Sequence, residues 1–498
     1  MSRLGRRGGD LLAFACGLAL PLGFAPFGVW PAPLLALAVA LQTWVARGPG
    51  VGFRRGWLFG LGAFGFGIGW VHVSMHDYGG ASLPLAYAVS LLLAGFLALY
   101  PALCAAWVAR TWQRDRRVWR VVVVLPAAWV LLEWVRGWLL TGFPWLELGY
   151  GQIDTPLAQL APLGGSLLVT AAAVFSAGLL WALAAALPLG RVLAAALLAL
   201  LWLGLAWLGP RDWTRPAGAP FAVAVVQGNV SQELKWQPGE RDATLERYRA
   251  LTEASADARL VVWPETAVPL FYDQVADGYL AEVGEAARAR GSDLLLGIPF
   301  RDPDSGAFYN GMLALSAPPG AYFKRHLVPF GEFLPLRPWL GSLLEFIQVP
   351  QGDFTPGPAE QPPLAVAGTE VGVTICYEVV FSREVRSALP RAGLLVNASN
   401  DGWFGRSIGP HQHLEIARMR ALESGRYLLR ATNTGISAII GPHGELRARS
   451  PQFEVATLRG EVVPLAGATP YVAQGDAPLL AVCALLLLLG WLPPPRRL

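Results

Sequence analysis

The order of hydrophobic and polar positions divides the chain into three parts. Residues 10–208 are almost continuously apolar, residues 218–465 mix apolar and polar positions as water-soluble domains do, and residues 476–494 are apolar again. A helix that crosses a membrane needs ~20 mostly apolar residues. We therefore expect a membrane domain over 1–208, a linker over 209–217, a folded domain over 218–465 and a last membrane helix over 476–494.

Eight windows in the apolar parts are long enough to form membrane helices. Seven precede the linker and one follows the folded domain, at residues 10–26, 30–46, 56–75, 83–109, 119–139, 157–187, 190–208 and 476–494. The sixth window contains Pro162 and the pair Gly164-Gly165. Proline lacks an N–H and glycine is conformationally free, so both interrupt helices. We expect a break or a re-entrant segment at that point.

The middle part alternates short apolar runs with helical stretches. The expected strands include 221–226, 260–263, 293–298, 310–315, 371–376, 393–397 and 436–440, and the expected helices include 241–258, 278–290 and 411–422. Strands and helices that alternate at this spacing are typical of a layered α/β domain. The predicted fold class is thus an α-helical polytopic membrane domain joined to an α/β domain.

Charge placement predicts the orientation of the chain in the membrane. The chain of 498 residues is 54% hydrophobic and 15% charged, with a net charge of +4. The loops on one side of the predicted spans hold Arg3, Arg6, Arg7, Arg47, Arg54, Arg55, Arg110, Arg114, Arg116, Arg117, Arg120, Arg191, Arg496 and Arg497. The short loops on the other side hold no Lys or Arg. Because cytoplasmic loops are rich in Lys and Arg, we expect cytoplasmic termini and a periplasmic domain on a bacterial cell inner membrane. The positive charge then reflects topology and does not indicate a nucleic-acid partner.

One cysteine of the chain is a candidate reactive thiol. Cys16, Cys104 and Cys483 fall inside predicted spans, and only Cys376 lies in the folded domain, at the end of the strand predicted over 371–376. A cysteine without a partner in an oxidising compartment is a candidate nucleophile. The alternative is a small buried hydrophobic side chain, which is the role of most free cysteines.

Two other residues at the ends of predicted elements suit such a thiol. Glu265 follows the strand predicted over 260–263, and Lys324 follows an aromatic pair. Lys324 is one of two lysines among 39 basic residues, which argues against a role in general surface charge. A carboxylate can take a thiol proton, while an ammonium can lower the thiol pKa and stabilise an oxyanion. We therefore expect these two residues to act together with Cys376.

Several separated motifs resemble those of a known family. They are Trp-Pro-Glu265-Thr-Ala, Lys324-Arg-His-Leu-Val-Pro-Phe-Gly-Glu332, Cys376-Tyr-Glu378, Asn397-Ala-Ser-Asn-Asp-Gly-Trp-Phe404 and Arg430-Ala-Thr-Asn-Thr-Gly435. These blocks resemble the nitrilase, or carbon–nitrogen hydrolase, superfamily. With seven spans before them and one after, the whole chain resembles the apolipoprotein N-acyltransferase family. The resemblance implies a nitrilase-like α-β-β-α sandwich on an eight-helix membrane domain.

The resemblance also implies roles for individual residues and for partners. Cys376 would be the nucleophile, Glu265 the general base and Lys324 the stabiliser of the oxyanion. Family positions that shape the site match Glu332, Tyr377, Glu378 and, on a mobile loop near the cysteine, Trp236. The implied partners are the lipid bilayer, a phospholipid acyl donor such as phosphatidylethanolamine, and the α-amine of a diacylglyceryl-cysteine on an apolipoprotein. No cofactor and no metal ion are implied.

Two other functions stay open from the sequence. A membrane-tethered C–N hydrolase of a small amide would use the same three residues, because water and an amine differ only in what attacks a thioester. A transporter or scaffold with an inactive exported domain is the other, although the intact Glu–Lys–Cys set argues against it. The apolar stretch 329–354 favours a lipid donor, and it would be either core packing or an arm that dips into the membrane.

Two groups of charged residues have expected structural roles. Glu133 and Arg136 share one face of the fifth predicted span, and we expect an ion pair that supports the loop 142–145, with a phospholipid headgroup contact as the alternative. The helix predicted over 411–422 carries several charged residues, among them His413. We expect them on an exposed face or in the wall of the site, and not at a metal.

Overall fold

The structure, a computed structural model, describes residues 5–45, 47–114, 116–231, 235–333 and 354–491. It divides into two compact units. The first, called the membrane unit here, comprises Met1–His72, Ser82–Arg211 and Gln474–Leu498, and the second, called the α/β unit, comprises Val73–Ala81 and Asp212–Ala473. Most of the apolar stretch 329–354, including Trp339 and Phe346, lies outside the described residues.

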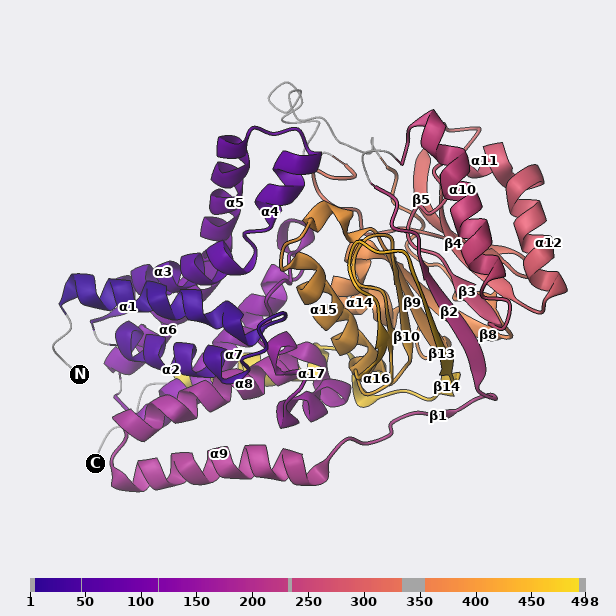
Figure 1. Cartoon of the computed structure of the whole chain (residues 1–498). Coiled ribbons are helices and arrows are strands. Elements are labelled where there is room, and N and C mark those ends of the chain that lie inside the picture. The colour runs from indigo at the N-terminus through magenta and orange to yellow at the C-terminus, as the bar shows by residue number, and fades with distance from the viewer. Residues whose placement is uncertain (1–4, 46, 115, 232–234, 334–353, 492–498) are drawn as a thin grey trace. The chain divides into compact units, whose positions relative to one another are not determined.

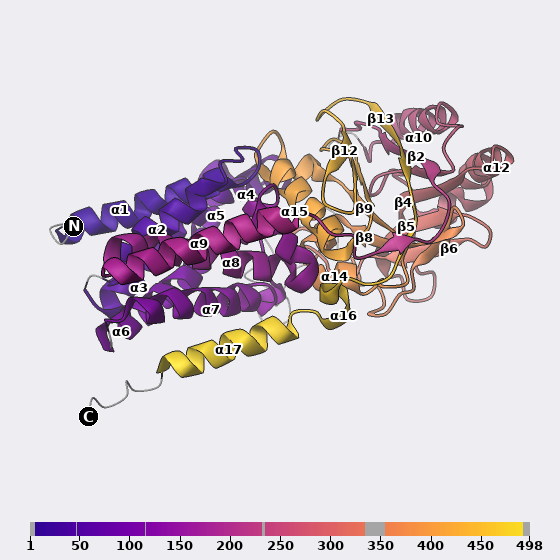
Figure 2. The ribbon, with the colours of Figure 1, turned by 90° about the horizontal axis from the view of Figure 1, so that it is seen from below.

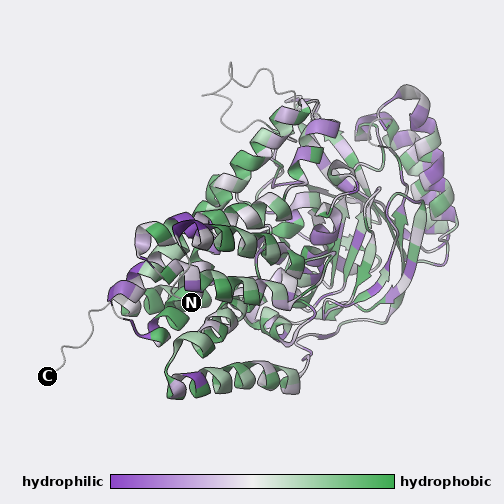
Figure 3. Ribbon diagram, turned by 60° about the vertical axis from the view of Figure 1, so that its left-hand side comes forward, coloured by the Kyte–Doolittle hydropathy of each residue, from purple (hydrophilic) through white to green (hydrophobic). Residues whose placement is uncertain are grey.

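The membrane unit is built from helices, most of which run in similar directions (Figure 2). Their bounds are α1 Arg6–Ala19, α2 Pro31–Val45, α3 Pro49–Gly67, α5 Leu83–Leu97, α6 Leu99–Arg114, α7 Val118–Arg136, α8 Ala161–Ala185, α9 Pro188–Leu208 and α17 Ala477–Trp491. Proline in the first turn begins α3, α5 and α9, where its missing N–H leaves no hydrogen bond unmade. In Figure 3 the ribbons of these helices are mostly green, the colour of hydrophobic residues.

Four helices of the described residues are long and apolar enough to cross a membrane. They are Leu83–Arg114, Val118–Arg136, Pro156–Ala185 and Pro188–Leu208, and a fifth is reached if the bent pair Pro49–Gly67 and Val71–Tyr78 counts as one span. The apolar helices Pro31–Val45 and Ala477–Gly490 are shorter than a full span. The chain is therefore a multi-pass membrane protein, with four to five spans of full length among the residues that the structure describes, and the count of eight stays a prediction.

Two local features of the membrane unit confirm expectations from the sequence. Inside α8 the backbone leaves helical geometry at Gly164 (φ −155°, ψ 26°) and Gly165 (φ 70°, ψ −175°), at the predicted break. Arg136 Nη2 lies 3.5 Å from Glu133 Oε1, and Arg136 Nη1 donates to the carbonyl oxygens of Phe143 and Trp145. The pair thus holds the loop after α7, as predicted.

The α/β unit is a sandwich of two six-stranded sheets in the described residues (Figure 1). The first sheet has the order β13-β2-β3-β4-β5-β6, with β2 Phe221–Gln227, β3 Leu260–Val262, β4 Asp293–Arg301, β5 Phe308–Leu315, β6 Gly320–Phe323 and β13 Ala456–Val462. The second has the order β12-β11-β10-β9-β8-β7, with β7 Leu364–Val366, β8 Thr369–Ile375, β9 Leu394–Ser399, β10 Leu428–Thr432, β11 Ala438–Ile440 and β12 Leu446–Arg449. A two-stranded ladder joins β1 (Arg215–Pro216) to β14 (Leu465–Ala466).

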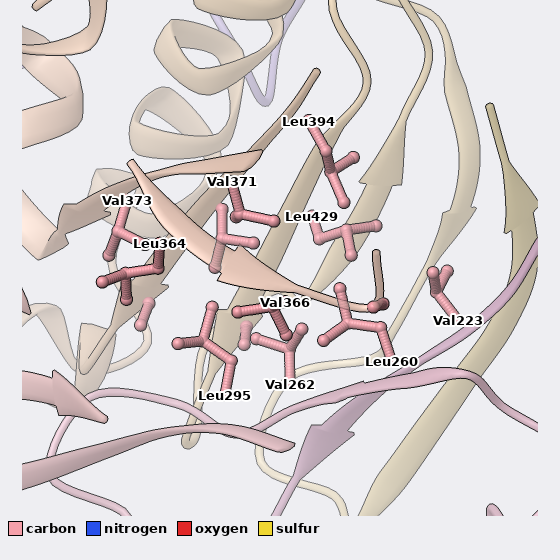
Figure 4. Close-up of a cluster of buried hydrophobic side chains, with 14 of the residues drawn as sticks. Val223, Leu260, Val262, Leu295, Leu364, Val366, Val371, Val373, Leu394 and Leu429 are labelled. Carbon is pink, nitrogen blue, oxygen red and sulfur yellow. The ribbon is translucent and has the colours of Figure 1, made fainter. Parts of the chain in front are cut away.

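The core of the sandwich lies between the two sheets. Alternate residues of a strand point to opposite faces, so Val223 and Val262 of the first sheet meet Val371 and Leu429 of the second in one buried cluster (Figure 4). Side chains on the other face of the first sheet, such as Val261, pack in a separate cluster against α10 (Pro238–Glu253) and α12 (Ala281–Ala289). Helices α14 (Ser382–Arg386) and α15 (Gly409–Ser424) lie against the second sheet. These layers form the predicted α-β-β-α sandwich.

The sheet topology brings the predicted site residues to one end of the sandwich. Strands β2, β3 and β4 are parallel to one another, and so are β8, β9 and β10. Glu265 follows the carboxyl end of β3, Lys324 directly follows β6, and Cys376 directly follows β8. The strand predicted over 371–376 therefore ends one residue early, because Cys376 begins the 3₁₀ turn Cys376–Val380.

Candidate active site

Cys376 sits in a strained backbone position at the end of β8. Its φ is 50°, in the left-handed region that non-glycine residues rarely occupy. The side chain is 8% exposed. Its carbonyl oxygen accepts hydrogen bonds from Asn397 Nδ2 and His413 Nε2, both at 3.3 Å. Strain of this kind persists only where the surroundings hold it, and it concentrates at functional sites.

Glu378 acts as a clamp on the turn that carries Cys376. Its Oε2 accepts the Ile375 N–H at 2.8 Å and the Tyr322 hydroxyl at 3.0 Å. Its Oε1 accepts the Arg325 N–H at 2.6 Å and the His326 N–H at 3.2 Å. Burial raises the pKa of this carboxyl, and the backbone donors oppose that effect. Glu378 thereby ties the end of β8 to the residues that follow Lys324.

Lys324 lies between two carboxylates. Its Nζ is 2.8 Å from Glu332 Oε1 and 3.5 Å from Glu265 Oε1, and its side chain is 1% exposed. The backbone of Lys324 is fixed as well, because its N–H donates to Asn310 O and its carbonyl accepts the Gly357 N–H. The ammonium is therefore held in one place by both its charge partners and its main chain.

Asn310 and Asn400 orient the carboxylate of Glu265. Asn310 Nδ2 donates to Glu265 Oε1 at 2.7 Å and to Glu332 Oε1 at 3.2 Å, so it bridges the two carboxylates. The backbone N–H of Asn400 donates to Glu265 Oε2 at 2.9 Å. Each oxygen of Glu265 thus has a donor, which fixes the plane of the carboxylate.

The electrostatics of the site correct one expectation for Cys376. We expected the nearby cation to lower the thiol pKa, but burial and the Glu265 carboxylate raise it, against the opposing effect of Lys324, to about 12. Cys376 is therefore a thiol at neutral pH and needs a base to become a nucleophile. For Lys324, burial lowers the pKa, but the carboxylates of Glu332 and Glu265 outweigh burial, so the pKa lies above its ordinary value.

A second buried network supports Cys376 from the side of β9 and β10. Arg430 Nη2 lies 2.8 Å from Asp401 Oδ2 and 2.9 Å from His413 Nδ1. Burial and Arg430 lower the pKa of His413, so its ring is neutral. Since the Cys376 carbonyl can only accept, Nε2 carries a proton, while Nδ1 lies between Arg430 Nη2 and Asp401 Oδ1, which is 3.1 Å away. The prediction that α15 helps to build the wall of the site is confirmed for His413. The alternative, an exposed charged face, is wrong, because most of the charged side chains of this helix are buried.

Known proteins match the chain over nearly its whole length. Residues 16–179 match the family described as apolipoprotein N-acyltransferase N-terminal domain, and residues 222–471 match the carbon-nitrogen hydrolase family. An apolipoprotein N-acyltransferase of Methylococcus capsulatus is 45% identical over 482 residues, which are 95% of this chain and 94% of that protein. One of Azotobacter vinelandii is 46% identical over 98% of this chain and 95% of that protein.

The chain belongs to the apolipoprotein N-acyltransferase family. Its α/β unit is the carbon–nitrogen hydrolase part of the enzyme. Among solved structures, a carbon-nitrogen hydrolase from Helicobacter pylori is 16% identical with a TM-score of 0.39, and the match covers 49% of this chain and 89% of that one.

The other predicted site residues of this N-acyltransferase occupy different positions. Tyr377 is buried and packs its ring on Phe381, with centroids 5.0 Å apart, and near His326 at 5.8 Å. Trp236 is 39% exposed, and the described contacts do not join its ring to the groups around Lys324. No group of three or more His, Cys, Asp or Glu that could hold a metal ion occurs within the described ranges.

Sequence reasoning missed several residues of this site. The sequence marks Asn310 only as the first residue of the strand predicted over 310–315, and its polar side chain next to an apolar run is a usable signal. Lys235 was passed over although it is the other lysine of the chain. Its Nζ donates to Thr266 Oγ1 at 2.6 Å and lies 3.5 Å from the carbonyl oxygen of Glu265. The Asn400 N–H gave no signal, because any residue carries a backbone donor.

Proposed function

We propose that this N-acyltransferase works by a two-step exchange through a thioester on Cys376. The acyl donor is a phospholipid, and the acceptor is the α-amine of the N-terminal diacylglyceryl-cysteine of an apolipoprotein. The observation that carries the proposal is the Lys324 ammonium, 3.5 Å from Glu265 and 2.8 Å from Glu332, because both Lys324 and Glu265 act electrostatically on the buried Cys376 thiol. A base, a cation and a nucleophile in one buried cluster are the parts that acyl transfer needs.

In the first step the thiol attacks an ester carbonyl of the phospholipid. The Glu265 carboxylate takes the Cys376 proton as the sulfur–carbon bond forms, which the high thiol pKa makes necessary. The carbonyl electrons move to oxygen, and the Lys324 ammonium donates to that oxyanion. When the intermediate collapses, the ester C–O bond breaks and Glu265 returns the proton to the leaving oxygen. The products are a thioester on Cys376 and a lysophospholipid.

In the second step the lipoprotein amine attacks the thioester carbonyl. Glu265 takes a proton from the attacking nitrogen, and Lys324 again holds the oxyanion. The C–S bond then breaks, and Glu265 returns the proton to the sulfur. A thiolate leaves more readily than an alkoxide, so the amide forms and the free Cys376 thiol is restored. Glu332 and Asn310 keep the base and the cation in register during both steps.

The proposal includes the arrangement in the membrane. Seven spans over 1–208 and one over 476–494 put both termini in the cytoplasm, with the catalytic domain over 218–465 in the periplasm. Support comes from the distribution of arginines, which occupy alternate loops. A cysteine-accessibility scan of single-cysteine variants at the loops 76–82 and 110–117 would test it. Labelling of 110–117 from the periplasm would overturn the orientation.

Capture of a fluorescent phosphatidylethanolamine tests the thioester. The purified enzyme in detergent should retain an acyl label that hydroxylamine removes, and peptide mass spectrometry should place the label on Cys376. The Cys376→Ala variant should retain none, and equal labelling of the two proteins would overturn the assignment. The mass of a lipoprotein N-terminus then separates the reactions, because transfer adds one acyl group whereas a C–N hydrolase adds nothing.

A further inference from the structure

Both lysines of the chain lie at the same carboxylate residue. Lysine and arginine together number 39, and only Lys235 and Lys324 are lysines. Lys324 meets the carboxylate of Glu265, and Lys235 meets its backbone at the carbonyl oxygen, 3.5 Å away, and at the next residue, Thr266. Two residues of a rare type at one position point to a requirement for lysine chemistry there. Lys235 has no role in the reaction as described so far.

The charge balance of the cluster calls for a second cation. Lys235 is 1% exposed, and Glu265 and Glu332 are also buried. Two carboxylates and the single ammonium of Lys324 would leave a buried negative charge, which is costly in a protein interior. The ammonium of Lys235 removes that excess. The titratable groups that face Glu265 are then Lys324, Lys235 and Cys376, with Glu332 joined through Asn310.

The turn that carries Glu265 is strained and closely packed. Thr266 has φ 45°, a value that β-branched residues avoid. A Cβ at Gly297 of β4 would lie 2.5 Å from Thr266 N and 2.7 Å from Glu265 Cα, so only glycine allows the strand to approach this turn. Lys235 lies between β2 and α10, and its 2.6 Å hydrogen bond to Thr266 Oγ1 holds the strained residue in place.

We propose, on the basis of the function proposed above, that Lys235 is a positioning residue for the general base. Its ammonium holds the strained Glu265–Thr266 turn through Thr266 Oγ1 and the Glu265 carbonyl oxygen, and so orients the carboxylate that accepts the Cys376 proton. Burial lowers the pKa of Lys235 to about 8, against the opposing effect of Glu265. The second cation is therefore present at neutral pH and disappears as the pH rises through about 8.

Three substitutions separate the charge of Lys235 from its hydrogen bonds. Lys235→Gln keeps a donor for Thr266 without the charge, Lys235→Arg keeps a charge that does not titrate, and Lys235→Met removes both. Arg247→Met is the matched control, because Arg247 Nη1 donates to Gly228 O at the start of the same loop and lies outside the cluster. Each full-length variant is purified in detergent, and its melting temperature is measured.

The first readout is the rate of acyl-enzyme formation with fluorescent phosphatidylethanolamine between pH 4 and 10. Lys235→Gln should lower the rate at pH 7 about tenfold and raise the midpoint of the acidic limb by about one pH unit, because a nearby opposite charge lowers a carboxyl pKa. Lys235→Arg should keep the acidic midpoint of the wild type. Because arginine does not titrate in this range, its rate should not change near pH 8, where the wild-type Lys235 loses its charge. Arg247→Met should match the wild type throughout.

The second readout does not need a lipid. It is the pH dependence of Cys376 alkylation by iodoacetamide, followed by peptide mass spectrometry. Removing a cation makes the thiolate harder to form, so Lys235→Gln should shift this profile to higher pH as well. If the wild type forms no acyl-enzyme but the alkylation profile shifts, the proposed function fails and the role of Lys235 stands. If acyl transfer proceeds and neither profile shifts in Lys235→Gln, the role of Lys235 is overturned. If Lys235→Gln does not fold, Lys235→Met is tested in the same way.

Discussion

The enzyme contains two buried carboxylate–cation pairs with the same separation and different surroundings. Glu133 Oε1 and Arg136 Nη2 of the membrane unit lie 3.5 Å apart, and so do Glu265 Oε1 and Lys324 Nζ of the α/β unit. Arg136 also donates hydrogen bonds, through Nη1, to the carbonyl oxygens of Phe143 and Trp145. Lys324 instead faces a second carboxylate, Glu332, and a thiol. One pair holds a loop, and the other belongs to the reactive centre proposed above.

The choice of cation matches this difference. A guanidinium has five donors in a fixed fork, which suits several carbonyl acceptors at once, whereas an ammonium is a compact point charge. Glu133 and Arg136 come from one turn of a helix, so folding of α7 alone brings them together. Glu265, Lys324 and Cys376 follow three different strands, and Glu332 lies in the loop after β6, so only the complete sandwich assembles them. We therefore expect substitutions in the first pair to change stability and substitutions in the second to change the reaction.

The largest expected effect comes from Lys324→Met. The variant should lose about 10³ in the rate of acyl-enzyme formation, the scale of one lost oxyanion donor. Removing the cation also leaves the two buried carboxylates of Glu265 and Glu332 with Lys235 as their one remaining ammonium, so the melting temperature should fall. The double variant Lys324→Met/Glu332→Gln removes one of these charges and should regain stability without regaining activity. Recovery of activity in the double variant would contradict the role of Lys324.

Glu265→Gln should have the next largest effect, with opposite signs in two assays. Acyl transfer should fall by several hundredfold, within the range of roughly 10²–10⁴ for general-base catalysis. The Glu265 carboxylate raises the pKa of Cys376, so its removal should bring the thiol pKa below about 12. The midpoint of iodoacetamide alkylation should therefore move to lower pH. A rise in that midpoint would mean that Glu265 does not face the thiol as described.

Arg136→Met should change stability and leave the chemistry of the folded enzyme intact. The substitution leaves Glu133 as an unpaired buried charge and frees two loop carbonyls, which should cost about 3 kcal/mol of unfolding free energy. Acyl-enzyme formation per folded molecule should stay within about twofold of the wild type. The measurement is a thermal unfolding curve beside single-turnover labelling. A large loss of labelling with unchanged stability would favour the headgroup contact instead.

Much of the fold could be predicted because its signals are local. Apolar runs predicted the helices, the glycine pair predicted the break in α8, and short apolar runs predicted β2, β8 and β9. The strands β10, β12 and β13 were missed, because β12 and β13 carry charged residues such as Arg449 and Arg459 at the sandwich edges. Strand β10 (Leu428–Thr432) overlaps the motif Arg430–Gly435, and that stretch was assigned to a motif and not to a strand.

The candidate site could be predicted as a set of residues but not as a geometry. Strand ends and rare residue types singled out Glu265, Lys324 and Cys376. Lys324 does lower the pKa of the Cys376 thiol, as predicted, but the net shift is upward, because sequence does not show how deeply Cys376 is buried or that Glu265 counteracts Lys324. Lys235 was missed because its partner Thr266 is distant in sequence, and such long-range contacts depend on the finished sheet topology.

Tyr322→Phe should have the smallest effect, and it tests whether Glu378 belongs with the structural pair or with the reactive one. The change removes one of the four donors to Glu378 and leaves the backbone N–H groups of Ile375, Arg325 and His326. Loss of one buried hydrogen bond should cost about 1 kcal/mol, and acyl-enzyme formation should fall by no more than about threefold. Tyr309→Phe, on the neighbouring strand, is the matched control and should match the wild type. A hundredfold loss in Tyr322→Phe with normal stability would mean that Glu378 takes part in proton transfer, and the two pairs would then no longer divide the work as proposed.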